Sequence, residues 1–292
     1  MIEAWFILAI AYAFCHATVG FLDKLVLRKK IYPLSLNNVR FAFNSIIAFV
    51  IILFFFQTNL TYSSAVWILF LAISIIYFLS TLGHFFGLQL EDVSKAIPYR
   101  EGLSTFLAYA LPIIFLFEKL TVYHTIGTLV IIIGTYIILS DGKKIIPKLS
   151  KGIMIITISG IAMPVIGVLS KVAVENVNPM TLNFFTYTLV FLYITSTSIY
   201  FKPKELKETA KFLFEDKKLL GIAFTSSLLA TVGTLFLNFA LTMGKASQVL
   251  PLSRTLPLFA VIYGSLFLKE KYSKVRFFGA ALIVAGMFLI NF

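Results

Sequence analysis

Ionisable side chains stand inside otherwise apolar stretches of this chain, at Arg40, His84, Arg100, Glu101 and Arg254. Placing such a group in hydrocarbon costs at least about 2.5–3.5 kcal/mol, so each is a candidate for a functional site. Arginine donates strong hydrogen bonds to carboxylates and phosphates, and histidine titrates in the range that suits proton transfer. The chemistry indicated is the recognition of a small charged compound rather than bond making or breaking.

Each of these residues also has a structural interpretation. Arg254 lies about 12 Å into its apolar stretch, near the middle of a bilayer core of about 30 Å, so it must face a hydrated cavity or a partner. Arg40 stands about one turn into its stretch and could snorkel to the headgroups. Glu101 could form a salt bridge with Arg40 or Arg100, although neighbours on one helix point about 100° apart, so Arg100 and Glu101 are not expected to pair. His84 could serve only as a structural hydrogen-bonding residue.

Other polar residues in the apolar stretches could line a cavity or bond to a neighbouring helix. With them, the predicted substrate-binding set comprises Arg40, His84, Tyr99, Arg100, Glu101, Lys171, Asn183, Tyr187, Asn238 and Arg254. The sequence contains no P-loop, HExxH motif or nucleophile elbow, and Cys15 is its single cysteine. We therefore expect no catalytic residues, no metal and no cofactor, and hence no enzyme.

The composition is that of a membrane protein. Hydrophobic residues make up 59% of the 292 residues and charged residues 13%, against about 25% charged in soluble domains. One crossing needs about 20 apolar residues, and residues 41–90 contain no Asp, Glu, Lys or Arg. We expect an all-α integral membrane protein with ten transmembrane helices, at residues 4–23, 37–56, 66–90, 95–117, 121–140, 152–174, 179–200, 219–243, 246–268 and 274–291.

The net charge of +12 is attributed to basic residues in loops on the cytoplasmic side rather than to nucleic-acid binding. The loops after the odd-numbered predicted helices hold 19 of the 25 Lys and Arg residues, and the other loops hold 3. The positive-inside rule then places the first set in the cytoplasm and both termini outside. We expect a multi-pass protein of the cytoplasmic membrane whose partners are lipid, a small-molecule substrate and protons. The connection at residues 201–218 is expected to be a solvated surface segment.

An internal repeat divides the chain. Residues 81–96 align without a gap to residues 231–246, and Glu118-Lys119-Leu-Thr121 aligns to Glu270-Lys271-Tyr-Ser273 after a two-residue shift. The predicted units are residues 1–146 and 147–292, with five helices each. Because five is odd, the second unit enters the membrane from the opposite side, an inverted repeat typical of secondary transporters. The repeat also matches Gly127 and Gly134 to Gly279 and Gly286, which predicts close helix packing or a dimer contact.

Ten helices in two inverted halves resemble the drug/metabolite transporter superfamily, specifically its EamA-type members. The segment from Arg254 through Pro257 to Glu270-Lys271-Tyr-Ser273 resembles the family's apolar, proline-containing helix and the turn that ends it, and Glu118-Lys119-Leu-Thr121 is its first-half counterpart. The resemblance covers nearly the whole chain. It implies export or exchange of a small metabolite by alternating access.

Our preferred substrate is an amino acid or related carboxylate compound, which Arg100 and Arg254 could bind. His84 or Glu101 could couple transport to protons, or transport could be uncoupled. A sugar-phosphate or nucleotide-sugar exchanger and a lipid-linked-sugar flippase remain alternatives with the same fold. A channel-like or structural membrane protein is the alternative of another class. We expect a monomer or a weak homodimer.

Overall fold

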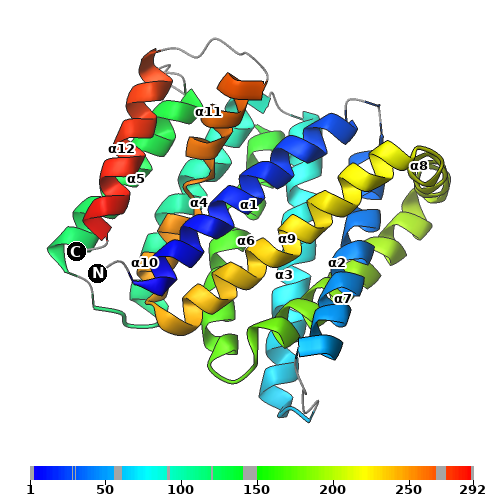
Figure 1. Cartoon of the computed structure of the whole chain (residues 1–292), viewed down its shortest axis with the longest axis horizontal. Helices are drawn as coiled ribbons and strands as arrows, with labels where there is room; N and C mark the ends of the chain where they lie inside the picture. Colours follow the sequence, from blue (N-terminus) through cyan, green and yellow to red (C-terminus); the bar gives the residue numbers. More distant parts are fainter. Residues whose placement is uncertain are drawn as a thin grey trace.

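The computed structural model describes residues 3–27, 29, 31–55, 61–90, 93–119, 121–140, 150–267 and 274–290, and the secondary structure of this part of the chain is entirely helical (Figure 1). Its helices are α1 (Ala4–Leu27), α2 (Pro33–Phe55), α3 (Ser64–Leu90), α4 (Val93–Phe115), α5 (Val122–Ser140), α6 (Lys151–Val174), α7 (Pro179–Phe201), α8 (Pro203–Glu215), α9 (Lys217–Met243), α10 (Ala246–Ser253), α11 (Leu256–Phe267) and α12 (Lys274–Ile290).

Two of these helices change the expected pattern. The predicted helix at 246–268 is broken into α10 and α11 at Arg254 and Thr255. Pro257 explains the break, because it has no N–H to donate to the carbonyl of Ser253 and its ring would clash with that carbonyl in a continuous helix. The other change is α8, which forms within the connection expected to be a solvated segment.

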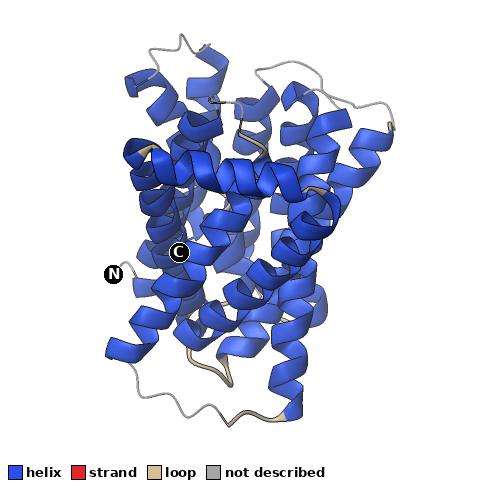
Figure 2. Ribbon diagram, turned by 90° about the vertical axis from the view of Figure 1, so that its right-hand side faces the viewer, coloured by secondary structure: helices blue, strands red, loops and turns tan. Residues whose placement is uncertain are grey.

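Helix α8, seen end-on at the right of Figure 1, lies across the bundle in Figure 2. Asp216 follows it and caps the next helix, accepting hydrogen bonds from the backbone N–H groups of Lys218 and Leu219 at 3.0 and 3.1 Å. Leu213 packs into an apolar cluster with residues of α1, α2 and α9, while Phe214 is exposed. A short amphipathic helix of this kind suits the plane of a membrane interface.

The outward faces of the bundle are apolar. Large side chains such as Phe54, Phe117 and Phe288 are more than half exposed, which is unfavourable in water but suits lipid. Six of the helices in the described part are long and apolar enough to cross a membrane, namely α1, α2, α3, α6, α7 and α9. The shorter apolar stretch Val122–Ile138 lies in α5. The helices of the described ranges are therefore those of a multi-pass membrane protein.

Helices of the first half pack mainly against helices of the second half, in a symmetric pattern. Helix α1 packs on α9 as α6 packs on α3, and the equivalent pairs α2 with α7, α4 with α10 and α5 with α12 pack directly on one another. Such pairing is expected when two five-helix units are related by a twofold axis, with α8 as an addition to the second.

The repeated glycines form one of these contacts. A Cβ atom built on Gly134 would lie 2.7 Å from the carbonyl oxygen of Gly279, and one built on Gly127 would lie 2.8 Å from that of Gly286. The four glycines thus let the backbones of α5 and α12 touch. Of the two interpretations that the sequence left open, these glycines fit close packing within one chain.

Candidate functional site

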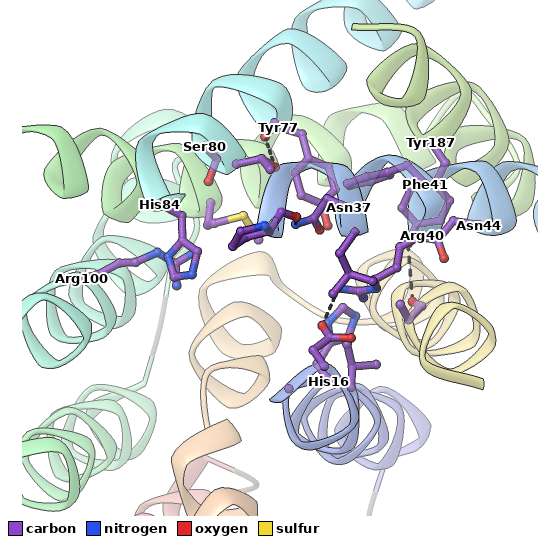
Figure 3. Close-up of a pocket in the computed structure, with 18 of the residues that line it drawn as sticks. His16, Asn37, Arg40, Phe41, Asn44, Tyr77, Ser80, His84, Arg100 and Tyr187 are labelled. Carbon is purple, nitrogen blue, oxygen red and sulfur yellow. Dashed lines mark hydrogen bonds and ion pairs between the residues drawn. The ribbon is translucent and has the colours of Figure 1, made fainter. Parts of the chain in front are cut away.

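The main cavity, with a volume of about 550 Å³, is lined mostly by the first half of the chain, and Met163, Tyr187 and Ala230 of the second half complete its wall. It is lined by the C-terminal parts of α1 and α3 and the N-terminal parts of α2 and α4, so it lies toward the end of the bundle where these helices connect. Tyr77, Ser80 and His84 come from α3, with His84 beside Arg100 (Figure 3). Five of the predicted site residues reach this cavity: Arg40, His84, Arg100, Glu101 and Tyr187.

Arg40 is paired in this structure. Its Nη1 donates to Asp23 Oδ2 at 2.5 Å, and Ser226 Oγ donates to the other oxygen of the same carboxylate at 2.7 Å. The side chains of Arg40 and Asp23 are 14% and 18% exposed. Arg40 therefore bonds to a carboxylate inside the bundle, rather than snorkelling to the headgroups.

Arg100 is paired as well, with its neighbour Glu101. The expectation that these two residues do not pair is wrong, because the arginine side chain is long enough to bend around the helix to the adjacent carboxylate. The Nε of Arg100 also donates to Ser159 Oγ on α6 at 2.9 Å. Both arginines of the main cavity thus carry a compensating carboxylate.

A second, smaller space continues toward the opposite end of the bundle. We call it the deep compartment; its volume is about 50 Å³, and its walls include Ser170, Asn183, Asn238 and Arg254. Four side chains line both spaces and form a ring between them: His16, Tyr77, Met163 and Tyr187. The main cavity and the deep compartment meet at this ring.

Arg254 is the exceptional residue of the deep compartment. It is 5% exposed, and its Nε is buried without a hydrogen-bond partner. No ion pair links it to an acidic side chain in the described ranges, in contrast to Arg40 and Arg100. It occupies the break between α10 and α11, a geometry that discontinuous transport helices use to present charge and free backbone groups to a substrate.

The other predicted site residues fall in three places. Asn238 and Asn183 hydrogen-bond to each other at 2.6 Å in the wall of the deep compartment. Lys171 Nζ donates to the carbonyls of Leu241 and Gly244 at 2.7 and 3.3 Å, where α9 ends, and it lines neither space. The side chain of Tyr99 lies outside the described residues. Substrate binding by this set stays a prediction.

The structure adds two residues that the sequence analysis did not single out. Asp23 holds Arg40, and His16 forms part of the ring, with its Nε2 3.3 Å from Thr234 Oγ1. His16 lies inside the predicted span 4–23 and Asp23 is its last residue. An ionisable side chain in a membrane span is itself the signal by which both could have been found.

We expect the Asp23–Arg40 pair to show strong coupling. Asp23→Asn and Arg40→Gln should each destabilise the protein, and the double variant should lose less than the sum, with a coupling of about 1–3 kcal/mol because each single change leaves a half-buried charge unpaired. Thermal unfolding in detergent of the four proteins measures it. Additive losses would mean that the pair does not stabilise the fold.

Comparison with known proteins identifies the family. The profile of the EamA-like transporter family matches residues 3–140 and again residues 150–292. The chain belongs to the EamA-like transporter family. It is a membrane transporter of the drug/metabolite transporter type, as the sequence resemblance predicted.

Two further similarities accompany the EamA match. An uncharacterised protein of Methanocaldococcus jannaschii is 39% identical over 79 residues, which are 27% of this chain and 58% of the relative. That match thus spans somewhat more than half of the relative's length. A crystal structure of another protein superposes with a TM-score of 0.79 over 99% of this chain and 96% of the other, at 15% identity. At that identity the likeness shows the fold alone.

Proposed function

We propose that this EamA-family protein moves an amino acid or related carboxylate compound across the cytoplasmic membrane by alternating access, as an exporter or exchanger. The observation that carries the proposal is Arg254, a buried arginine beside a cavity, at a break in a helix. Burying a cation without a partner is costly. A substrate carboxylate would supply the missing partner.

The two arginine pairs favour a small, zwitterionic or singly charged substrate. Asp23 and Glu101 already neutralise Arg40 and Arg100. The main cavity therefore does not demand a substrate with several negative charges. The substrate would pass the ring of His16, Tyr77, Met163 and Tyr187 before its carboxylate reached Arg254. The present deep compartment, at about 50 Å³, has room for one or two water molecules, so binding requires the ring to open.

Two inverted five-helix repeats, residues 1–146 and 147–292, would span the membrane ten times, with α10 and α11 together forming one span. In this arrangement the main cavity opens to the Lys- and Arg-rich cytoplasmic side and both termini lie outside. Rocking of one repeat against the other would expose Arg254 to either side in turn. His84 or Glu101, both in the main cavity, would provide the proton-linked group if transport is coupled.

A thermal-shift screen of the purified protein tests the substrate class. Amino acids, other carboxylates, sugar phosphates, nucleotide sugars and lipophilic cations are compared, since a ligand at 100 times its dissociation constant stabilises the native state by about 2.7 kcal/mol. We expect stabilisation by a carboxylate compound, followed by its counterflow in proteoliposomes. Stabilisation only by phosphorylated sugars or by cations would overturn the amino-acid class, and unsaturable flux would indicate a channel.

A further inference from the structure

Glu118 joins the two halves of the chain at the far end of the bundle, beyond the deep compartment. Its Oε1 accepts a hydrogen bond from the backbone N–H of Ala246 at 2.8 Å, and its Oε2 accepts one from that of Ser247 at 2.8 Å and a further one from the Ser247 hydroxyl. Resting on the proposed transport function, we propose that Glu118 is a gating residue, whose contact with the start of α10 closes the deep compartment to the far side of the membrane.

Both carboxylate oxygens of Glu118 bind the N-terminus of α10, which has no capping side chain from its own sequence. The residue before α10 is Lys245, whose side chain makes no capping hydrogen bond. The N–H groups of a first turn have no partner within their helix, and a negative charge there also interacts favourably with the helix dipole. Glu118 thus supplies from the first half the cap that α10 lacks.

The backbone beside Glu118 is strained in this closed arrangement, which favours release of the contact. Phe117 has a φ of +53°, the one positive φ of a non-glycine residue in the described part of the chain. A bulky residue in this left-handed region is disfavoured, and such strain persists only where surrounding contacts impose it. Release of Glu118 would allow Phe117 to relax, so closed and open arrangements can lie close in free energy.

The helix that Glu118 caps ends at the proposed substrate site. All eight residues of α10 are buried, and Arg254 is its C-cap. Eight residues of α-helix measure about 12 Å. A rigid helix of that length therefore links the contact at Glu118 to the guanidinium of Arg254, and displacement of one end moves the other.

Neighbouring contacts cross the same seam. Lys245 Nζ donates to the carbonyl of Lys119 at 2.5 Å, and the side chains of His124 and Gln248 approach to 2.6 Å. These bonds are partly or fully exposed, so water can replace them at little cost. The Glu118 carboxylate accepts three hydrogen bonds at once, more than any of these neighbouring contacts provides, and bonds to a charged acceptor are stronger than neutral ones.

Site-specific labelling tests the gate. In a Cys15→Ala background, which removes the single native thiol, Ser170→Cys reports on the deep compartment and Asn37→Cys on the main cavity. A membrane-impermeant maleimide is applied to each face in turn in oriented vesicles. Glu118→Gln keeps the size of the side chain but removes its charge. Glu205→Gln is the matched control, because Glu205 lies on α8 in an exposed contact with Lys202.

We expect Glu118→Gln to raise labelling of Ser170→Cys from the far face about tenfold, corresponding to about 1.4 kcal/mol, and to slow labelling of Asn37→Cys from the near face. Glu205→Gln should change neither rate. Unchanged rates in Glu118→Gln, with or without a lower melting temperature, would make Glu118 a static cap and overturn the gate.

Substrate counterflow by the unaltered protein separates this inference from the proposed function. Counterflow together with unchanged labelling in Glu118→Gln would overturn the gate and leave transport standing. A labelling change without counterflow of any carboxylate would support the gate and overturn the proposed substrate.

Discussion

Arg254→Met should weaken substrate binding strongly without destabilising the fold. Truncating one partner of a buried, hydrogen-bonded charge pair costs about 2–5 kcal/mol of binding energy, so the affinity for a carboxylate substrate should fall at least about 30-fold. In the empty protein the guanidinium is buried and its Nε has no partner. Replacing it with an apolar side chain of similar length should therefore leave the melting temperature unchanged or raise it.

The measurement is a pair of curves on the same preparation: thermal unfolding without ligand, and counterflow in proteoliposomes. Arg254→Lys keeps the charge but not the planar fork and should retain part of the binding. Lys211→Met, which removes an exposed charge of α8, is the control and should transport normally. A large loss of stability in Arg254→Met would show that Arg254 holds the fold together, and normal counterflow would remove it from the site.

Gly286→Ala should destabilise the protein although it adds only one methyl group. The new Cβ would lie 2.6 Å from the carbonyl oxygen of Gly127 and 3.0 Å from the backbone nitrogen of Ile131. These are backbone atoms that no rotamer change can move, so α5 and α12 must separate. We expect a loss of about 1–3 kcal/mol, and a larger one for Gly286→Leu, measured by thermal unfolding in detergent.

Gly221 provides the matched control for this experiment. It is also a helical glycine, on α9, but nothing lies within 4 Å of a Cβ built there. Gly221→Ala should therefore be neutral or stabilise the protein by about 0.5–1 kcal/mol, as expected for alanine in a helix. If both variants behaved alike, the contact between α5 and α12 would not be as close as the structure shows.

The repeat of these glycines shows what the sequence pattern could and could not predict about helix packing. Their repeat in both halves indicated that two helices make a close contact, but it did not show which two. A small residue permits an approach from any neighbour, whereas the choice of α12 as the partner of α5 depends on how all the helices are arranged. The sequence therefore left packing within the chain and a dimer contact open.

Local composition determined much about this protein. Long apolar runs make the membrane the solvent of helices α1, α2, α3, α6, α7 and α9. The cost of an ionisable group in hydrocarbon also singled out Arg40, Arg100 and Arg254. Such inferences succeed because each depends on the transfer of a residue or segment between water and lipid, which is a property of that segment alone.

Only the tertiary structure decided which of these charges has a partner. Asp23 reaches Arg40 from another helix, and Glu118 reaches α10 across more than a hundred residues, and no spacing in the sequence encodes those meetings. Even the Arg100–Glu101 pair was misjudged, because the direction of a Cβ does not limit where a long side chain ends. Arg254 stands apart only once the partners of the other arginines are known, because an uncompensated charge is a property of the whole surroundings and not of the residue.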